Sequence, residues 1–104
     1  MAVVGITDLV GDSKDLLAKY DKVSTAIRSA GPPSPGLISH TCVIRPEGLR
    51  IANVWESEAD LWSGYNSDTF QNAVKSAGME AVRPTVFPVH NYMYFGAPQP
   101  ASTT

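Results

Sequence analysis

The sequence predicts a single α+β domain with ferredoxin-like topology that works as a homodimer. Three observations predict this fold. The length of 104 residues fits one domain, the expected elements follow the order β-α-β-β-α-β, and the last strand is apolar on both faces. Right-handed crossovers turn that order into a four-stranded antiparallel sheet with both helices on one face. We expect the domain to span residues 1–96 and residues 97–104 to form a disordered tail.

The first two elements are a buried strand and an amphipathic helix. Residues 2–7 are short and β-branched, which is typical of a buried strand. Asp12 is the expected N-cap of the helix, because its carboxylate can accept from free amides of the first turn. Gly31 and the prolines after it end the helix. One helix face carries apolar side chains at spacings of four, three and four: Leu16, Tyr20, Val23 and Ile27.

A hairpin and a second helical region follow. The segments 37–44 and 49–55 read as strands, and the short turn between them implies antiparallel pairing. Ser57 is the expected cap of a short helix from Glu58 to about residue 64. Ser67 is the expected cap of a second helical segment, which ends at Gly78. Its apolar face carries Phe70, Ala73, Val74 and Ala77.

The last strand, predicted over residues 84–95, points to a partner. Pro88 cannot donate to a ladder, so the strand is expected at a sheet edge or bulged there. A strand that is apolar on both faces is usually buried on both. Because the chain has no third layer, a second copy is the expected cover, with two-fold symmetry. The two faces carry Val86, Tyr92 and Tyr94 on one side and Phe87, Val89, Met93 and Phe95 on the other.

Composition narrows the range of partners. Charged residues make up 17%, against roughly 25% in an average chain, which indicates that part of the surface is covered. The net charge is −2 and the basic residues are scattered, so a nucleic-acid partner is rejected. Cys42 is the single cysteine, which favours a reducing compartment. We see no signal peptide and no apolar run of membrane-spanning length, so we expect a cytoplasmic protein without a membrane partner.

Two short motifs resemble the dimeric α+β-barrel superfamily, and most closely its antibiotic-biosynthesis-monooxygenase-like domains. They are residues 54–59 (Val-Trp-Glu-Ser-Glu-Ala) and residues 66–70 (Asn-Ser-Asp-Thr-Phe). The Pro-Gly-led entry to the second strand at residues 36–40 also fits, and the resemblance covers residues 2 to 95. It implies a pocket between sheet and helices. Its members include cofactor-independent oxygenases acting on aromatic polyketides, haem-degrading enzymes, lactone isomerases and cyclases.

The haem-degrading branch of that superfamily has a pattern that this sequence does not keep. The branch carries an asparagine on the first strand, where this chain offers Thr7 and Asp8. The position of its tryptophan falls near Gly64, although Trp62 is close. The position of its histidine falls on Val74. The three departures argue against haem degradation.

His40 and His90 are the candidate catalytic residues, and both fall in predicted strands. An imidazole can take a proton from an acidic C–H or a phenol, as an oxygenase, isomerase or cyclase without a cofactor requires. The resemblance implies that the second and fourth strands approach each other across the dimer interface, so His40 of one subunit can lie near His90 of the other. The alternative is that each histidine satisfies a hydrogen bond in a core or interface.

Asn53 is unusual in mid-strand and is a candidate donor to a ligand carbonyl or oxyanion. The alternative is a hydrogen bond to a neighbouring strand or side chain. Trp55 shares its strand face and is more typical of a core residue than of a ligand platform. The remaining ligand-binding candidates are aromatic, and at helical spacing such side chains usually belong to a core: Trp62, Tyr65, Phe70 and Tyr92.

Two functional interpretations remain. The first is a cofactor-independent enzyme, monooxygenase-, isomerase- or cyclase-like, that acts on an apolar aromatic or polyketide-like molecule. The second is a non-catalytic homodimer that binds a small apolar ligand or has a structural role. No metal site is expected, because two histidines and one cysteine do not make a three-ligand set. No cofactor is expected either, since the chain has no phosphate-binding loop.

Overall fold

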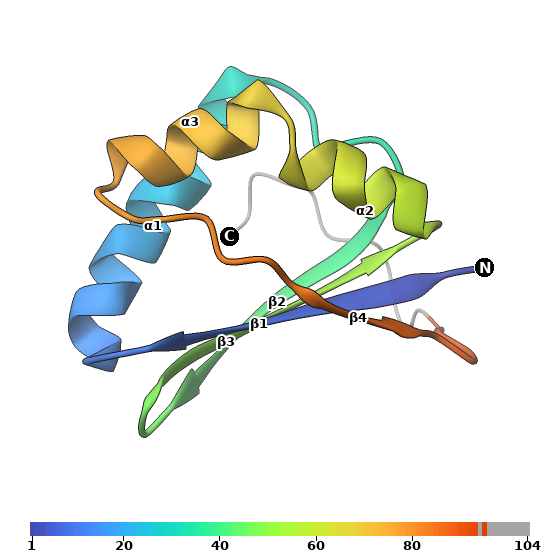
Figure 1. Ribbon diagram of the computed structural model, residues 1–104, viewed down its shortest axis with the longest axis horizontal. Helices are drawn as coiled ribbons and strands as arrows, with labels where there is room; N and C mark the ends of the chain where they lie inside the picture. Colours follow the sequence, from blue (N-terminus) through green and yellow to red (C-terminus); the bar gives the residue numbers. More distant parts are fainter. Residues whose placement is uncertain (94, 96–104) are drawn as a thin grey trace.

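The computed structural model describes residues 1–93 and 95, and the predicted tail at 97–104 lies outside them. In chain order the elements are β1 (Val3–Val10), α1 (Ser13–Ala30), β2 (Leu37–Arg45), β3 (Gly48–Trp55), α2 (Glu58–Tyr65), α3 (Asp68–Ser76) and β4 (Thr85–Pro88). The strands form one antiparallel sheet in the order β2-β3-β1-β4. All three helices lie on the same side of it (Figure 1). The predicted ferredoxin-like fold is confirmed, with β2 and β4 at opposite edges.

The helix starts are set by the three predicted caps. The Asp15 amide donates to Asp12 Oδ2 at 3.3 Å, so Asp12 caps α1. Ser57 Oγ accepts from the Asp60 amide at 3.1 Å at the start of α2. Ser67 Oγ accepts from the Phe70 amide at 3.2 Å at the start of α3. Because the second helical region contains its own internal cap, it forms two helices instead of one.

The most deeply packed part of the molecule lies under α2. Trp55, at the end of β3, is 7% exposed and packs with Val3 and Leu61. Gly64 makes this packing tight, because a Cβ placed there would lie 2.5 Å from Cη2 of Trp55. Trp55 is therefore a core residue that holds α2 on the sheet.

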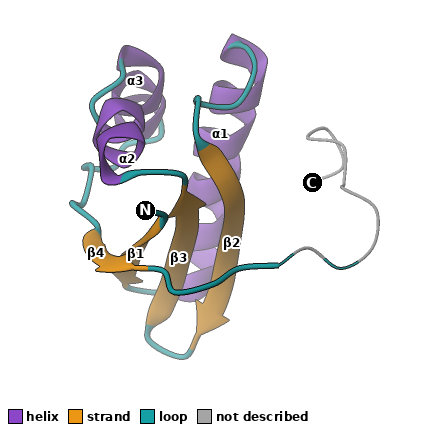
Figure 2. Ribbon diagram, turned by 90° about the vertical axis from the view of Figure 1, so that its right-hand side faces the viewer, coloured by secondary structure: helices purple, strands orange, loops and turns teal. Residues whose placement is uncertain are grey.

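The helix α1 is attached less tightly. Figure 2 shows α1 on the β2 side of the sheet and α2 and α3 on the β4 side. The predicted apolar face of α1 is only half-buried, and none of its residues is fully buried. The side chains between α1 and the sheet thus remain partly accessible.

The first strand is longer than predicted, because its polar end finds partners across the sheet. Asp8 lies opposite Arg50 in the β1–β3 register. The Arg50 side chain donates twice to the Asp8 carboxylate, at 2.7 and 3.0 Å. Arg45 approaches the same carboxylate at 3.2 Å and also pairs with Glu47. These ion pairs extend β1 to Val10, and they lie on the sheet face away from the helices.

The last strand is shorter than predicted, so the expected strand at 84–95 is wrong beyond Pro88. Pro88 faces Val3 in the β4–β1 register. The Val89 amide still donates to the Ala2 carbonyl at 2.9 Å. Beyond Pro88 the chain has passed the start of β1, and in the described residues it pairs with no further strand. His90 and Tyr92 therefore lie outside the sheet, and Tyr94 lies outside the described residues.

The sheet face away from the helices is largely apolar at the end opposite the ion pairs. Alternation along the strands places four large apolar side chains there, none of them fully buried: Val4, Ile6, Val54 and Phe87. The smaller Ala52, Thr41 and Thr85 lie on the same face. Phe87 is 49% exposed. We call the four large apolar residues the open face. In the described part of the chain, no helix is long and apolar enough to cross a membrane.

The Trp55–Gly64 contact yields a stability prediction. Gly64→Ala should lower the free energy of unfolding by about 1–2 kcal/mol, because overpacking against Trp55 outweighs the better helix propensity of alanine. Chemical denaturation measures this change. Ser63→Ala, an exposed change in the same helix, is the control and should stay within about 0.5 kcal/mol of the parent. An unchanged or raised stability for Gly64→Ala would contradict the packing described.

Candidate functional site

Three polar side chains meet on the helix-covered side of the sheet: Tyr20 from α1, His40 from β2 and Asn53 from β3. His40 and Asn53 face each other in the β2–β3 register, so their side chains leave the sheet on the same side. His40 Nδ1 lies 2.5 Å from Asn53 Oδ1. The Tyr20 hydroxyl is hydrogen-bonded to His40 Nε2. We call these three residues the polar triad.

The hydrogen bonds of the polar triad specify one tautomer of the His40 imidazole. Asn53 Oδ1 can only accept, so His40 Nδ1 carries the proton and donates to it. In the neutral ring Nε2 is then an acceptor, and the Tyr20 hydroxyl donates to it. The Tyr20 and His40 rings are nearly parallel, at 8°, with centroids 5.8 Å apart. His40 is thus held at both nitrogens in an orientation that leaves Nε2 basic.

Burial keeps the Tyr20 hydroxyl protonated. Partial burial of its side chain between α1 and the sheet raises the pKa of Tyr20. The nearby Cys42 and Asp21 raise this pKa further, while Arg28 lowers it. Burial also raises the pKa of Cys42, again with help from Asp21. At neutral pH Tyr20 is therefore a hydrogen-bond donor, and Cys42 is a neutral thiol. Among these side chains the imidazole is the one suited to accept a proton.

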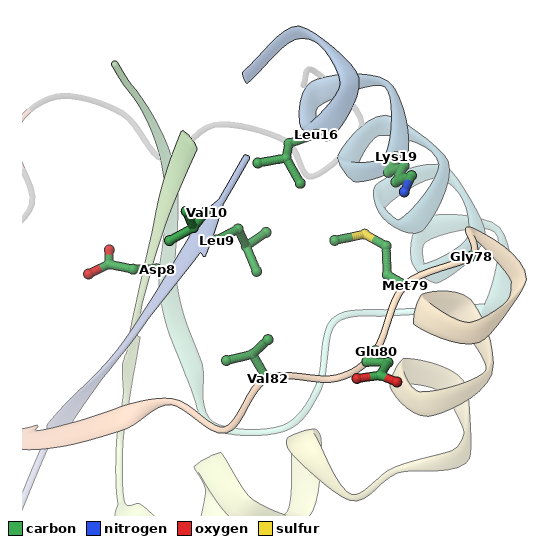
Figure 3. Close-up of a pocket in the computed structure, with 9 residues that line it drawn as sticks. All are labelled: Asp8, Leu9, Val10, Leu16, Lys19, Gly78, Met79, Glu80 and Val82. Atoms are coloured by element: carbon green, nitrogen blue, oxygen red, sulfur yellow. The ribbon is translucent and has the colours of Figure 1, made fainter. Parts of the chain in front are cut away.

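A shallow, open hollow of about 420 Å³ lies at one end of the same sheet side. Figure 3 shows its apolar side chains, Leu9, Leu16, Met79 and Val82, pointing toward one another, with Lys19 and Glu80 beside them. Asp8 points away from the hollow, to the other side of the sheet. The hollow therefore has a mixed lining, with apolar side chains at its floor and charged groups beside them, between β1, α1 and the segment before β4.

The hollow and the polar triad are separate, but α1 contributes side chains to both. Gly5 is paired with Asn53, and Leu9 is four residues further along β1, a distance of about 13 Å. Thr7 and Ile51, paired with each other, lie between these two rows. On α1, Leu16 and Tyr20 are one helical turn apart on the same face. Leu16 thus connects the hollow to the helix face that carries Tyr20.

The predicted aromatic ligand residues gather elsewhere. Trp62 and Tyr65 lie edge to face, and Tyr65 also contacts Phe70. The Arg83 guanidinium lies 4.3 Å from the Trp62 ring centroid and 5.9 Å from that of Tyr65. The Tyr65 hydroxyl donates to the Ala81 carbonyl at 3.4 Å. This cluster anchors the segment that leads into β4, and none of its residues belongs to the polar triad.

The structure therefore unites two of the predicted site residues and separates the rest. Asn53 makes the side-chain hydrogen bond that was one of its two predicted roles, and its partner is the candidate base His40. Trp55 is in the core. His90 and Tyr92 follow β4 and lie outside the sheet. In the part of the chain that the structure describes, no group of three or more His, Cys, Asp or Glu side chains is placed to hold a metal ion.

Tyr20 is the residue that sequence reasoning missed. It was assigned to the apolar face of the first helix, which is correct for its ring. Its hydroxyl was the overlooked signal, because a partly buried tyrosine usually finds a hydrogen-bond partner. The two other unusual polar residues on the inner strands, His40 and Asn53, were the available partners.

Solved structures share this architecture. No protein-family model and no curated protein matches the sequence. Rv0793 from Mycobacterium tuberculosis superposes with a TM-score of 0.63 at 17% identity, over 90% of this chain and 100% of that one. SnoaB, a cofactor-independent oxygenase from Streptomyces nogalater, superposes with a TM-score of 0.59 at 10% identity, over 88% and 94%. The haem-degrading protein Rv3592 from Mycobacterium tuberculosis gives 0.59 at 18% identity, over 90% and 100%.

Another similar structure is of an antibiotic biosynthesis monooxygenase, with a TM-score of 0.57 at 14% identity. The chain shares the ferredoxin-like α+β fold of these proteins. At these identities the similarity establishes the fold, and the chemistry must be argued from the residues of this chain.

The imidazole form in the polar triad can be tested without a substrate. Long-range ¹H–¹⁵N NMR spectra should show His40 protonated at Nδ1 in the parent protein. Asn53→Leu removes the acceptor while keeping a similar shape, and should shift His40 toward the Nε2-protonated form. His90→Gln removes the signals of His90, which assigns the remaining imidazole signals to His40, and this variant serves as the control. A parent His40 protonated mainly at Nε2 would contradict the arrangement.

Proposed function

We propose that the protein is a cytoplasmic, homodimeric enzyme that removes a proton from an apolar aromatic or polyketide-like molecule without a bound cofactor. The single observation that carries this proposal is His40, held between a protonated tyrosine and an asparagine. His40 serves as the general base, and Asn53 Oδ1 accepts the hydrogen bond from its protonated Nδ1. Asn53 then stabilises the imidazolium that forms, because that bond becomes charge-assisted.

One chemical step accounts for the proposed range of reactions. The proton of an acidic C–H or phenolic O–H moves to the imidazole, and the electron pair of that bond stays on the substrate. The resulting carbanion or phenolate is the intermediate that oxygenation by O₂, isomerisation and cyclisation have in common. SnoaB, which has the same fold, is a cofactor-independent oxygenase. That likeness supports the proposed class of reaction.

The hollow supports an apolar substrate. Leu9, Leu16, Met79 and Val82 give it an apolar part, which suits an aromatic or polyketide-like body, and Lys19 and Glu80 beside them suit polar substituents. Burial of that body between α1 and the sheet would place a polar end near Asn53 and Tyr20.

The homodimer is proposed from the open face. Val4, Ile6, Val54 and Phe87 form an apolar area that remains partly exposed in the described chain, and a second copy supplies a matching area. In the proposed dimer, the segment that follows Pro88 pairs with the β2 edge of the partner subunit. We place His90 and Tyr92 there, beside the His40 of the other subunit.

A second candidate is a homodimer that binds an apolar ligand without reaction. One observation favours it: both imidazole nitrogens of His40 already have protein partners. In that case the hollow is the binding site and the polar triad is structural. The two candidates differ in whether removing the imidazole abolishes a proton transfer or only alters stability.

Proton abstraction can be measured directly with 2-tetralone, an aromatic ketone with an acidic C–H. The protein in D₂O should accelerate deuterium exchange at that carbon, as followed by NMR. His40→Ala should lower the exchange rate by roughly 100-fold or more, because a general base contributes about 10²–10⁴-fold. Asn53→Leu should lower it by a smaller factor.

Arg83→Ala is the matched control, since Arg83 lies in the aromatic cluster and not in the polar triad, and it should exchange at the parent rate. Saturable binding of 2-tetralone with no acceleration over buffer would favour the binding-only candidate. Exchange at the parent rate in His40→Ala would rule out His40 as the base.

Dimerisation is tested by light scattering coupled to gel filtration. The parent should run as a dimer at micromolar concentration. Phe87→Glu should shift it to monomer. The open face would be buried in the dimer, and desolvating a charge there costs free energy. Val82→Glu is the control, because Val82 is similarly exposed, at 45%, but lines the hollow. A folded, monomeric parent would remove both the dimer and the proposed place of His90.

A further inference from the structure

Tyr20 occupies the one nitrogen of His40 that could take a proton from a substrate. Nδ1 is already protonated toward Asn53, so Nε2 alone is basic. The Tyr20 hydroxyl donates to that nitrogen. A substrate can therefore reach Nε2 only by displacing Tyr20 or by passing a proton through it.

The position of Tyr20 favours passage through it. Its ring belongs to the same face of α1 as Leu16, which lines the hollow one turn away. His40 lies on β2, at the edge of the sheet, whereas the hollow opens beside β1. A ligand in the hollow is thus next to the side of α1 that carries Tyr20, and β2 is separated from β1 by β3.

We propose that Tyr20 is a catalytic residue that takes the substrate proton on its hydroxyl oxygen while passing its own proton to His40 Nε2. The inference rests on the proposed function and adds the group that meets the substrate. It also specifies the ligand chemistry: an acidic O–H or C–H of an aromatic molecule, positioned to donate to a phenol oxygen.

The atoms and charges of this step balance. The substrate O–H or C–H bond breaks and a new O–H bond forms on Tyr20. The original Tyr20 O–H bond breaks and an N–H bond forms at Nε2. The substrate becomes an anion, Tyr20 ends as it began, and His40 becomes an imidazolium that donates to Asn53. No oxidant or cofactor takes part.

The environment of Tyr20 suits a relay better than a base. Partial burial between α1 and the sheet raises the pKa of Tyr20, and Cys42 and Asp21 add to the effect. The side chain therefore remains a phenol and not a phenolate. The nearly parallel rings hold the hydroxyl against the imidazole edge. A phenol fixed in this way can exchange one proton for another without itself changing charge.

The test is Tyr20→Phe in the 2-tetralone exchange reaction. This variant keeps the ring between α1 and the sheet and removes only the hydroxyl. We expect kcat for exchange to fall by roughly 10- to 100-fold, with KM changed less than about twofold. The split between kcat and KM separates a relay from a structural role, because loosened packing would weaken binding as well.

Ser76→Ala is the control. It also removes a hydroxyl that donates a hydrogen bond, to the Ala73 carbonyl, away from the polar triad and the lining of the hollow, and should exchange at the parent rate. Thermal melting of both variants checks that they are folded.

Two results separate this inference from the proposed function. If His40→Ala is inactive but Tyr20→Phe matches or exceeds the parent, then His40 acts directly and the relay is wrong, while the function stands. If the parent gives no exchange above buffer, the proposed function fails and the relay fails with it. A loss of kcat in Tyr20→Phe at unchanged KM, together with an inactive His40→Ala, supports both.

Discussion

The register of β3 between β1 and β2 is the constraint on which the rest of the structure depends. It pairs Asn53 with His40 and Arg50 with Asp8. Side chains alternate along a strand, so a slip of one residue would move Asn53 to the open face. Gly48 helps to hold the register, because its φ of 147° is unfavourable for other residues and a Cβ there would overlap the Leu9 carbonyl oxygen. One backbone alignment thus places both the polar triad and the ion pairs.

The distribution of packing explains why the candidate site is accessible. Trp55 and Leu61 are buried under α2, whereas α1 has no fully buried residue. A loosely packed helix over polar side chains leaves room for a ligand, and it also makes this region depend on support from elsewhere. In the proposed dimer that support comes from the open face, since burying it would stabilise the sheet on which α1 rests.

Prediction from the sequence succeeded where the signal was local. The caps Asp12, Ser57 and Ser67 act on amides within three residues of themselves, so their chemistry is visible in a short window. It failed at the ends of β1 and β4. Whether Asp8 continues a strand depends on Arg50, which is distant in sequence, and the end of β4 depends on where its neighbour β1 begins.

For this protein, the sequence by itself determined the elements, their order and, with them, the sheet topology. It also singled out His40 and Asn53 as polar residues in unusual places. Only the tertiary structure decided that these two residues form a hydrogen bond with each other and that Tyr20 completes the triad. It also decided that the aromatic cluster of Trp62, Tyr65 and Phe70 lies apart from the triad. The reason is physical: periodicity shows which face of an element is covered, but a hydrogen bond between α1, β2 and β3 exists only after those elements have packed.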